Sequence, residues 1–331
     1  RGNTHQWIKS FLSGRSQQVI VDGASSEKAP VISGVPQGTV LGPLLFLLFI
    51  NDLPACVNSR TRLFADDCII YRPIKMPQDC QQLQHDLVDL AEWESTWGMA
   101  FHPDKCNVLR VTRAKSPVQF SYHLKGQQLE EVTTSKYLGV DLSSSLQWKD
   151  HIDRTVKKAN STLGFLRRNL RISSSDTKAT AYMTLVRPTL EYCASVWNPY
   201  TAQSKQQLEM VQRRAARYCT NRYHNTSSVT DMLQDLNWES LESRRTKMQL
   251  TMLYKIINDL VDIPPSAYLT PASTRTRAHH SKKLRQYSTR TDAFKFSFFP
   301  RTIPLWNSLP ATVAEAPDLV HFKQGLSTLT F

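Results

Sequence analysis

The sequence has few cysteines, and they show no metal-binding or redox spacing. Six cysteines are scattered over 331 residues, at positions 56, 68, 80, 106, 193 and 219. None of them forms a CxxC pair or a zinc-like Cys/His pattern. This excludes a disulfide-rich secreted scaffold or a zinc finger as the organising feature, and it predicts a reduced, intracellular chain.

Membrane spans and targeting signals are also missing from the sequence. The most apolar run, residues 40–50, is far shorter than a bilayer span and contains Gly42 and Pro43. The chain opens with Arg-Gly-Asn-Thr-His, which has neither a methionine nor an apolar signal region. We therefore expect no membrane partner, no readable targeting signal, and a start inside a longer protein.

Acidic residues are fewer than basic ones. The chain has 28 Asp and Glu against 41 Lys and Arg, which gives a formal net charge of +13. Such an excess favours a polyanionic partner, because basic side chains that neutralise phosphates release counterions. A basic protein without such a partner is the alternative, since net charge governs association rather than fold. The length and a hydrophobic content of 40% predict a folded chain of about two domains.

Two adjacent aspartates, Asp66 and Asp67, lie between two short apolar runs. The runs are typical of strands, and the polar pair between them predicts a tight hairpin turn. Asp-Asp lacks the glycine that accepts a positive φ, and two neighbouring like charges cost stability unless a cation neutralises them. The pair therefore predicts a divalent-metal site suited to magnesium, with an ordinary solvated turn as the alternative.

A loop rich in glycine and proline precedes this pair, over residues 33–44. Its special residues are Gly34, Pro36, Gly38, Gly42 and Pro43. Glycines let a backbone approach a ligand closely, and Gln37 adds a planar amide, so the loop is a candidate nucleotide or base-pair contact. A loop that merely connects is the alternative, because the P-loop ending is absent. The apolar residues 44–50 that follow predict a helix buried on most sides.

The first 146 residues otherwise predict short strands and one long helix. Extended segments are expected at residues 17–21, 29–32, 99–101, 108–111 and 118–124, and from 137 onward. A turn is expected at Asp22-Gly23. An amphipathic helix is expected from Pro77 to Trp97, closed by Gly98.

From about Trp148 the sequence becomes helical and basic. Helices are expected over residues 154–171, 176–197 with an interruption at Pro188, 203–223, and 239–260. Residues 154–171 contain six basic side chains and no acid. Residues 271–301 contain one acid and eight basic residues: Arg275, Arg277, Lys282, Lys283, Arg285, Arg290, Lys295 and Arg301. These helices and this arm are candidate phosphate contacts, with solvated faces as the alternative.

Several of these motifs together resemble a known family. Residues 33–46, then Ile50-Asn51-Asp52-Leu53, then Phe64-Ala65-Asp66-Asp67 resemble the reverse transcriptase of non-LTR (LINE-like) retrotransposons. The similarity continues through residues 97–101, Lys105-Cys106 and residues 135–140. Residues 212–217 and 304–310 resemble segments downstream of the polymerase in jockey and CR1-type elements. His102 departs from the family, which more often has Asn before Pro-Asp-Lys.

The resemblance implies an α+β fold. Residues 1–146 would form a partial right-hand polymerase palm, an antiparallel sheet with packed helices. Residues 147–262 would form a helical thumb or connection region, and residues 263–331 a basic, partly ordered C-terminal tail. The partners implied are an RNA template, a DNA primer and a dNTP, with the duplex held by the basic thumb and tail. The resemblance also implies an intracellular location, in the nucleus and the cytoplasm.

The resemblance also implies residue roles. Asp66 would ligate metal, with Asp67 as its less direct neighbour, and Lys105 would lie near the departing pyrophosphate as a proton donor or charge stabiliser. The nucleotide and template contacts would be Gly34, Pro36, Gln37 and Gly38. The primer grip would be Tyr137, Leu138 and Gly139.

The implied activity is RNA-directed DNA polymerisation by two-metal phosphoryl transfer with Mg²⁺. In the family a third carboxylate lies on an earlier strand, which would precede residue 1, and neither Asp22 nor Asp52 is placed to replace it. We therefore expect one ion at best in this chain, against two in a complete enzyme, and no polymerase activity from the chain alone. A non-enzymatic, nucleic-acid-binding remnant of a degraded element is one alternative. A basic helical interaction protein with an incidental Asp-Asp turn is another.

Overall fold

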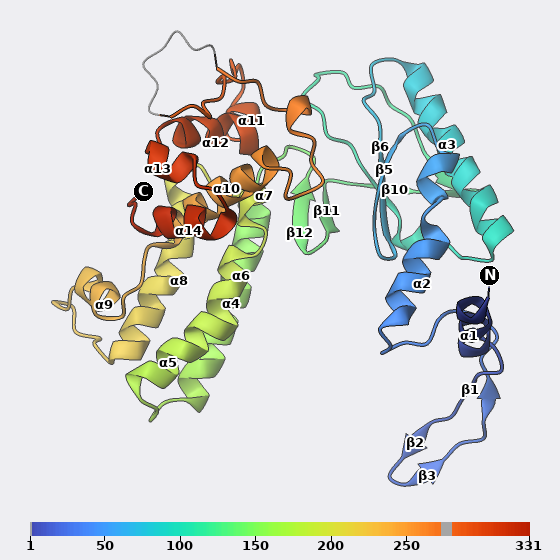
Figure 1. Ribbon diagram of the computed structural model, residues 1–331, viewed down its shortest axis with the longest axis horizontal. Helices are drawn as coiled ribbons and strands as arrows, with labels where there is room; N and C mark the ends of the chain where they lie inside the picture. The colour runs from blue at the N-terminus through green and yellow to red at the C-terminus, as the bar shows by residue number, and fades with distance from the viewer. Residues whose placement is uncertain (1, 273–279) are drawn as a thin grey trace. The chain divides into compact units, whose positions relative to one another are not determined.

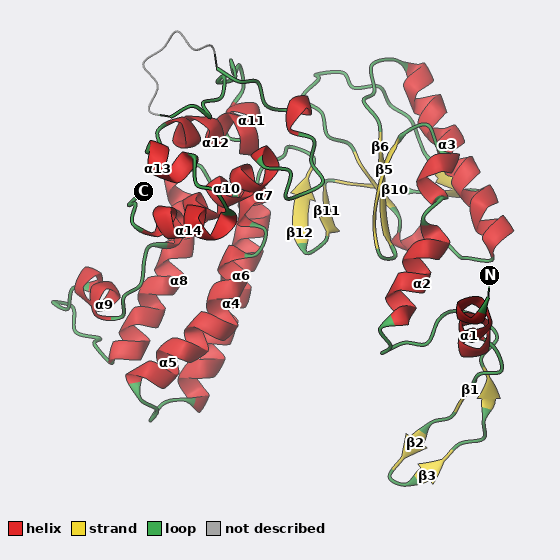
Figure 2. Cartoon of the chain, in the orientation of Figure 1, coloured by secondary structure: helices red, strands yellow, loops and turns green. Residues whose placement is uncertain are grey.

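The computed structural model describes residues 2–272 and 280–331, and the chain divides into two compact units between Val132 and Thr133. The first unit mixes short strands with helices, whereas the second has one strand pair at its start and is otherwise mainly helical (Figures 1 and 2). The architecture is therefore α+β, as the sequence predicts. In the described part of the chain, no helix combines the length and the apolar character needed to cross a bilayer.

Over residues 2–132 the first unit contains three α-helices, two 3₁₀ turns and ten short strands. In chain order they are α1 (Asn3–Leu12), β1 (Ser16–Gln17), β2 (Ile20–Val21), β3 (Ala24–Ser25), β4 (Ala29–Pro30), α2 (Leu41–Ile50), η1 (Leu53–Cys56), β5 (Arg60–Phe64), β6 (Asp67–Tyr71), α3 (Pro77–Trp97), η2 (Pro103–Lys105), β7 (Asn107–Leu109), β8 (His123–Leu124), β9 (Gln127–Gln128) and β10 (Glu130–Val132). The antiparallel pairs are β1–β4, β2–β3, β5–β6 and β8–β9, and the parallel pair is β7–β10.

Helix α3 carries the core of the first unit. Its apolar face buries Leu87, Leu90 and Trp93 in a cluster that also contains Ile50 and Tyr122. Gly98 ends the helix with a left-handed conformation, φ 66°, which is the predicted cap.

A buried carboxylate on α3 fixes the start of the β5–β6 hairpin. Asp86 is fully buried and accepts hydrogen bonds from the backbone N–H groups of Asn58 and Ser59, both at 2.9 Å. Burial alone would raise the pKa of Asp86, but its hydrogen bonds with Asn58, Ser59 and Gln82 together outweigh burial and hold that pKa below its ordinary value. The hairpin that carries Asp67 is therefore anchored to the helix.

Some predicted elements of the first unit differ from the structure. The turn at Asp22-Gly23 is confirmed between β2 and β3. The predicted strand over residues 118–124 was too long, because only His123–Leu124 pair. Residues 99–101 form no strand either, because a 3₁₀ turn follows at Pro103, where proline removes a ladder donor.

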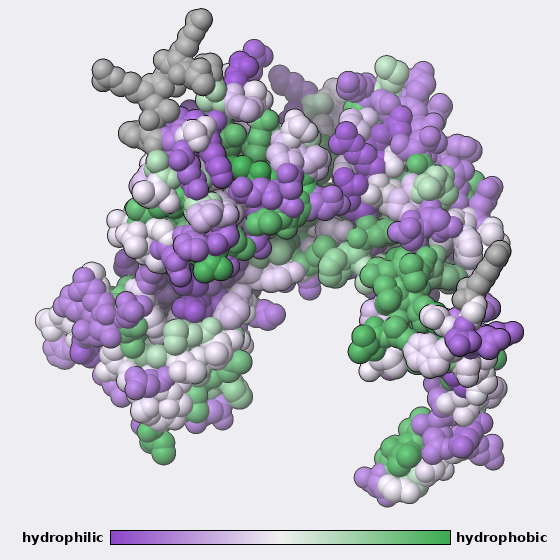
Figure 3. Space-filling model, viewed as in Figure 1, coloured by the Kyte–Doolittle hydropathy of each residue, from purple (hydrophilic) through white to green (hydrophobic). Residues whose placement is uncertain are grey.

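The predicted burial of the apolar helix was wrong. Helix α2 forms where expected, but among its residues only Gly42 and Ile50 are buried. Leu44, Leu47 and Leu48 are each at least half exposed. Figure 3 shows apolar side chains gathered over this helix. A helix that is apolar on all sides is expected to be packed against other elements on all sides. In the described residues of the first unit, other elements pack against α2 on one side only.

The second unit begins with a hairpin and continues as packed helices. In chain order its elements are β11 (Thr134–Tyr137), β12 (Val140–Ser143), α4 (Lys149–Asn169), α5 (Ser175–Ala181), η3 (Tyr182–Val186), α6 (Arg187–Glu191), α7 (Ala194–Trp197), α8 (Ala202–Thr220), α9 (Val229–Asp235), α10 (Leu241–Ile257), η4 (Pro265–Ala267), α11 (Asp292–Lys295), α12 (Phe298–Asn307), α13 (Ala311–Ala314) and α14 (Leu319–Ser327).

Two hydrophobic cores stabilise the second unit. One lies among α4, α5 to α7 and α8, around Leu163, Tyr182 and Trp197. The other lies among α10, α12 and α14, where Tyr254, Trp306 and Phe322 pack ring against ring. Residues beyond 280 therefore form part of a packed core.

The helix expected over residues 176–197 is divided into four pieces. A π-helical turn, η3, occupies residues 182–186 directly before Pro188, whose ring lacks an N–H and disfavours a regular helix. A second break follows at Cys193, which has φ 53°. The predicted interruption at Pro188 is confirmed, and it is accompanied by the break at Cys193.

Candidate functional site

The aspartate pair lies at the tip of the β5–β6 hairpin. The strand register pairs Phe64 with Asp67 and Leu63 with Cys68. The two-residue turn is therefore Ala65-Asp66, one residue earlier than predicted. Leu63 and Cys68 face the core, and burial of this face sets the register.

The two carboxylates are exposed and have no partner in the part of the chain that the structure describes. Neither Asp66 nor Asp67 accepts a hydrogen bond or forms an ion pair with a described residue. In residues 2–272 and 280–331 there is also no cluster of three or more His, Cys, Asp or Glu side chains placed to hold a metal. Magnesium is often held by one or two carboxylates together with waters and substrate phosphates. The pair fits an ion of that kind and does not by itself complete a two-metal site.

The Gly-rich loop is built by close backbone packing. Gly34 and Gly38 have φ of 72° and 75°, so both occupy conformations that other residues adopt at a cost. A Cβ on Gly42 would lie 2.6 Å from the carbonyl oxygen of Pro36. Thr39 joins the same two residues, since its hydroxyl donates to the Pro36 oxygen at 2.8 Å and accepts from the Gly42 N–H at 3.1 Å. The turn at Gln37-Gly38 is left exposed.

An arginine that sequence reasoning missed fixes the start of this loop. Arg15 donates to the carbonyl oxygens of Ser33 at 3.1 Å and Gly34 at 2.6 Å, and also to that of Leu12 at 2.9 Å. It thereby ties the end of α1 to the loop. One arginine among many basic residues gives no signal in the sequence that could have revealed this role.

Lys105 ends the 3₁₀ turn η2 and is exposed. No hydrogen bond or ion pair joins its side chain to Asp66 or Asp67. The turn itself is held by Gln127, whose amide donates to Asp104 at 2.6 Å. Lys105 is therefore an exposed cation on a fixed turn.

The predicted primer grip forms the turn of the β11–β12 hairpin. Tyr137 pairs with Val140, and Leu138 and Gly139 between them have φ of 46° and 81°. Two consecutive positive φ values are typical of a type I′ hairpin turn. The three predicted residues thus lie together at one hairpin tip.

Two residues that sequence reasoning missed hold this tip. The Tyr192 hydroxyl donates to the Leu138 carbonyl at 3.0 Å, and Arg154 donates to the Gly139 carbonyl at 2.9 Å. Arg154 also forms an ion pair with Asp141 on β12. Arg154 opens the acid-free run of basic residues, which was a usable signal, whereas Tyr192 lies in an ordinary apolar stretch.

A basic pocket of about 390 Å³ adjoins the hairpin tip. Its lining includes Lys136, Gly139, His151, Arg154, Lys158 and Tyr192. Burial lowers the pKa of His151 from its ordinary 6.5; the carboxylate of Asp141 opposes this shift and Arg154 adds to it. The neutral ring accepts a hydrogen bond from the Asp141 N–H through Nδ1 at 3.2 Å. Around the tip, cations outnumber acids.

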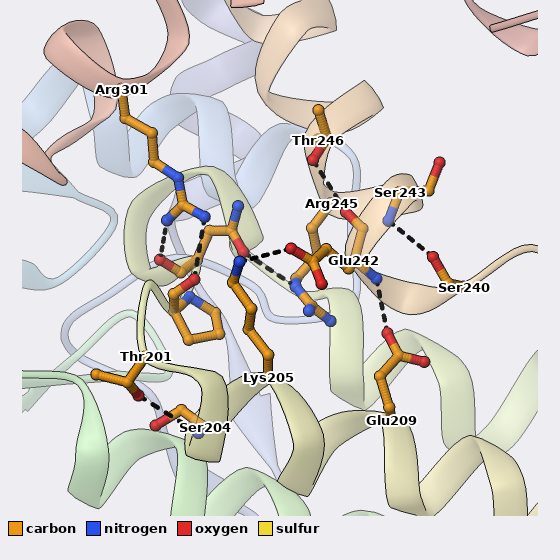
Figure 4. Close-up of polar contacts among 12 residues, drawn as sticks. Thr201, Ser204, Lys205, Glu209, Ser240, Glu242, Ser243, Arg245, Thr246 and Arg301 are labelled. Carbon is orange, nitrogen blue, oxygen red and sulfur yellow. Dashed lines mark hydrogen bonds and ion pairs between the residues drawn. The ribbon is translucent and has the colours of Figure 1, made fainter. Parts of the chain in front are cut away.

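Some of the basic residues predicted to contact phosphates either cannot be described or are bonded within the protein. Arg275 and Arg277 lie outside the described residues. Arg301 donates to the carbonyl oxygens of Asn198 and Pro199, and burial lowers its pKa to about 10 (Figure 4). Arg301 therefore has a structural role, whereas Arg285 and Arg290 are exposed.

The same region contains a partly buried polar network that joins α8 and α10 (Figure 4). Arg245 is fully buried, and its Nε donates to Asn198 at 3.1 Å. Lys205 pairs with Glu242 at 2.6 Å, and the Glu242 N–H donates to Glu209 at 2.8 Å. These charges serve packing between helices.

Comparison with known proteins identifies the chain. Residues 2–142 match the family described as "Reverse transcriptase (RNA-dependent DNA polymerase)". The "Probable RNA-directed DNA polymerase from transposon BS" of Drosophila melanogaster is 30% identical over 251 residues, which cover 72% of this chain and 28% of that protein. The "RNA-directed DNA polymerase from mobile element jockey" of Drosophila funebris is 30% identical over 205 residues, 58% of this chain and 22% of that protein.

The chain therefore contains a reverse transcriptase domain. More narrowly, it belongs with the LINE-like reverse transcriptases of non-LTR retrotransposons. It spans only 28% and 22% of the lengths of these two relatives. No solved structure is significantly similar to it.

Proposed function

We propose that this chain is part of an RNA-directed DNA polymerase that copies an RNA template from a DNA primer. One observation carries the proposal: a domain of the reverse transcriptase family presents, at a hairpin tip, two exposed carboxylates that have no partner among the described residues. In this proposal residues 1–146 are part of the palm, residues 147–262 the thumb or connection region, and residues 263–331 a basic C-terminal region.

The proposed roles follow the chemistry of each side chain. Asp66 and Asp67 hold magnesium, which when bound neutralises phosphate charge and activates the primer 3′-hydroxyl. The exposed turn at Gln37-Gly38, with Gly34 and Pro36, lies against the incoming nucleotide and its template base. Lys105 places a positive charge, or a proton, at the departing pyrophosphate. The hairpin tip at Tyr137, Leu138 and Gly139 holds the primer.

A second function, nucleic-acid binding without catalysis, is favoured by a specific observation. Among the described residues, no third His, Cys, Asp or Glu joins the two adjacent carboxylates at the hairpin, and two ions about 4 Å apart need more than one aspartate to hold them. We therefore propose that the 331-residue chain binds primer–template but does not extend the primer by itself.

The test combines extension with metal binding. The 331-residue chain is incubated with an RNA template, a DNA primer, dNTPs and magnesium, and we expect no extended product. Robust extension would overturn the proposed lack of activity. In parallel, Mn²⁺ is added to the chain with primer–template, and nuclear magnetic resonance follows paramagnetic broadening at residues 64–68.

Matched variants make the metal experiment specific. We expect broadening in the wild type, and its loss in Asp66→Asn with Asp67→Asn. Asp22→Asn, at another exposed hairpin turn of the same unit, should leave the broadening unchanged. Equal broadening in all three proteins would contradict the metal site.

A further inference from the structure

A second basic pocket lies among α4, α5 and α8, and the proposed function gives it no role. Its volume is about 640 Å³, within the range of pockets that hold small ligands. Arg167, Arg168, Arg171 and Lys178 line it together with Tyr218 and Tyr223, and no acidic residue does. Among the described residues, no carboxylate forms an ion pair with any of these four cations.

Lys178 forms the buried part of the pocket. It is 1% exposed, and its Nζ donates to the Asn221 side-chain oxygen at 3.0 Å and lies 5.2 Å from the centre of the Tyr218 ring. Burying an ammonium without a carboxylate is costly, because the lost hydration is only partly replaced. An ammonium has three donor protons, and the bond to Asn221 uses one of them. An anion entering the pocket could accept from the other two and so make up for the lost hydration.

The dipole of helix α4 explains the position of two of the four cations in the pocket, but not of the other two. Arg167 and Arg168 lie in the last turn of α4, where cations interact favourably with the helix dipole. Arg171, however, lies beyond the end of α4, and Lys178 lies on α5. The dipole of α4 does not account for those two, so the convergence of four cations needs another explanation.

An aromatic side chain completes the site. Tyr223 is 54% exposed and lines the same pocket, whereas Tyr218 is buried with its hydroxyl donating to the Leu166 carbonyl at 3.0 Å. An exposed ring beside cations suits a nucleotide, whose phosphate binds the cations while its base stacks on the ring. Only an unpaired base has a free face to offer, because duplex bases stack on one another.

We infer that this pocket binds single-stranded nucleic acid, with a phosphate between Arg168, Arg171 and Lys178 and an unpaired base on Tyr223. The inference rests on the proposed function, since a polymerase that copies a template must handle single strands as well as duplex. It adds a binding site built from residues other than those of the hairpin tips described above.

The test compares single-stranded and duplex DNA of equal length by fluorescence anisotropy over a range of salt concentrations. Arg168→Gln with Arg171→Gln should weaken single-strand binding more than duplex binding. It should also reduce the single-strand salt slope by up to about 0.7, the contribution of one phosphate contact. Arg213→Gln with Arg214→Gln removes the same charge from α8 outside the pocket, and should leave the ratio of the two affinities unchanged.

Tyr223 gives an independent measurement. Tyr223→Leu should weaken single-strand binding by roughly 5- to 150-fold, the range measured for loss of one stacked base, while Tyr223→Phe should bind like the wild type. Neither variant is expected to alter the melting curve, because the side chain is exposed. Lys178→Met should also weaken binding, and its circular dichroism melt shows whether it folds.

Three results would overturn the inference. The pocket pair and the Arg213–Arg214 pair could lower both affinities equally, Tyr223→Leu could bind like the wild type, or inorganic phosphate could compete as well as a mononucleotide does. In each case primer–template duplex would still bind, so the proposed function would survive. Wild-type protein that binds single strands but not primer–template would instead contradict the proposed function.

Discussion

The hydroxyl of Tyr192 donates a hydrogen bond to the carbonyl oxygen of Leu138 at 3.0 Å. This contact joins the residue that follows α6 to the tip of the β11–β12 hairpin. Arg154 on α4 makes a second contact at the next residue, Gly139. A hairpin tip with two positive-φ residues is thus held in place by α4 and by the residue that follows α6, and changes at any of these positions should affect the others.

Gly139→Ala should destabilise the second unit. The alanine would have to adopt φ near 81°, which costs about 1–2 kcal/mol, and its Cβ would lie 3.2 Å from the Tyr192 ring. Urea denaturation should therefore give a free energy of unfolding lower by about 1–2 kcal/mol. Tyr192→Phe, which removes one exposed hydrogen bond, should cost about 0.5 kcal/mol. A fully stable Gly139→Ala protein would show that the turn has another conformation.

The sequence allowed much of the fold to be predicted where one local signal dominates. The amphipathic period and Gly98 predicted α3, and Asp22-Gly23 predicted a turn. Predictions failed where tertiary packing decides. The burial of α2 depends on what packs against it, and the length of the strand before Leu124 depends on having a partner to pair with.

The candidate site shows the same division. Its chemistry could be predicted, because the paired acids and the loop glycines at positions 34, 38 and 42 are visible in the sequence. The register that places Ala65, rather than Asp67, in the turn depends on which face the core buries. Arg15 and Tyr192 act through contacts with residues 18 to 54 positions away, and such contacts leave no local pattern.

The stability of the second unit should fall as pH decreases below 6.5. Burial holds the pKa of His151 below its ordinary 6.5 in the folded state, with Asp141 opposing the shift and Arg154 adding to it. The unfolded chain therefore takes up a proton first as pH falls. This contribution to stability is complete well above pH 6.5 and is lost below it, down to the lowered folded pKa.

Urea denaturation at several pH values measures this effect. His151→Gln is the matched control, since a glutamine oxygen can still accept from the Asp141 N–H. The unfolding free energy of the wild type minus that of His151→Gln should decrease from pH 7.5 to pH 5.5. These two pH values lie about one unit above and below the ordinary pKa of histidine. A difference independent of pH would contradict the assignment.

Gly42→Ala should disturb the Gly-rich loop more than Gly38→Ala. The new Cβ at position 42 would lie 2.6 Å from the Pro36 oxygen, a backbone atom that moves only with the loop. At position 38 the Cβ would meet nothing within 4 Å, so the cost there is limited to the positive φ of 75°, about 1–2 kcal/mol. In the wild type the N–H of residue 42 donates a hydrogen bond to the Thr39 hydroxyl. Hydrogen exchange at this N–H should be faster than in the wild type in the Gly42→Ala protein, and unchanged in the Gly38→Ala protein.

Ala65 gives a test of the hairpin that carries the aspartates. It has φ 50°, in the left-handed region that alanine adopts at a cost and β-branched residues rarely adopt. Ala65→Val should therefore lower the free energy of unfolding of the first unit by about 1–2 kcal/mol, whereas Ala65→Gly should leave it unchanged or raise it by up to about 1 kcal/mol. If the turn were Asp66-Asp67, as the sequence suggested, Ala65 would be an ordinary strand residue. Valine, which favours strands, would then be tolerated and glycine would destabilise, so the order of the two variants in urea denaturation decides between the registers.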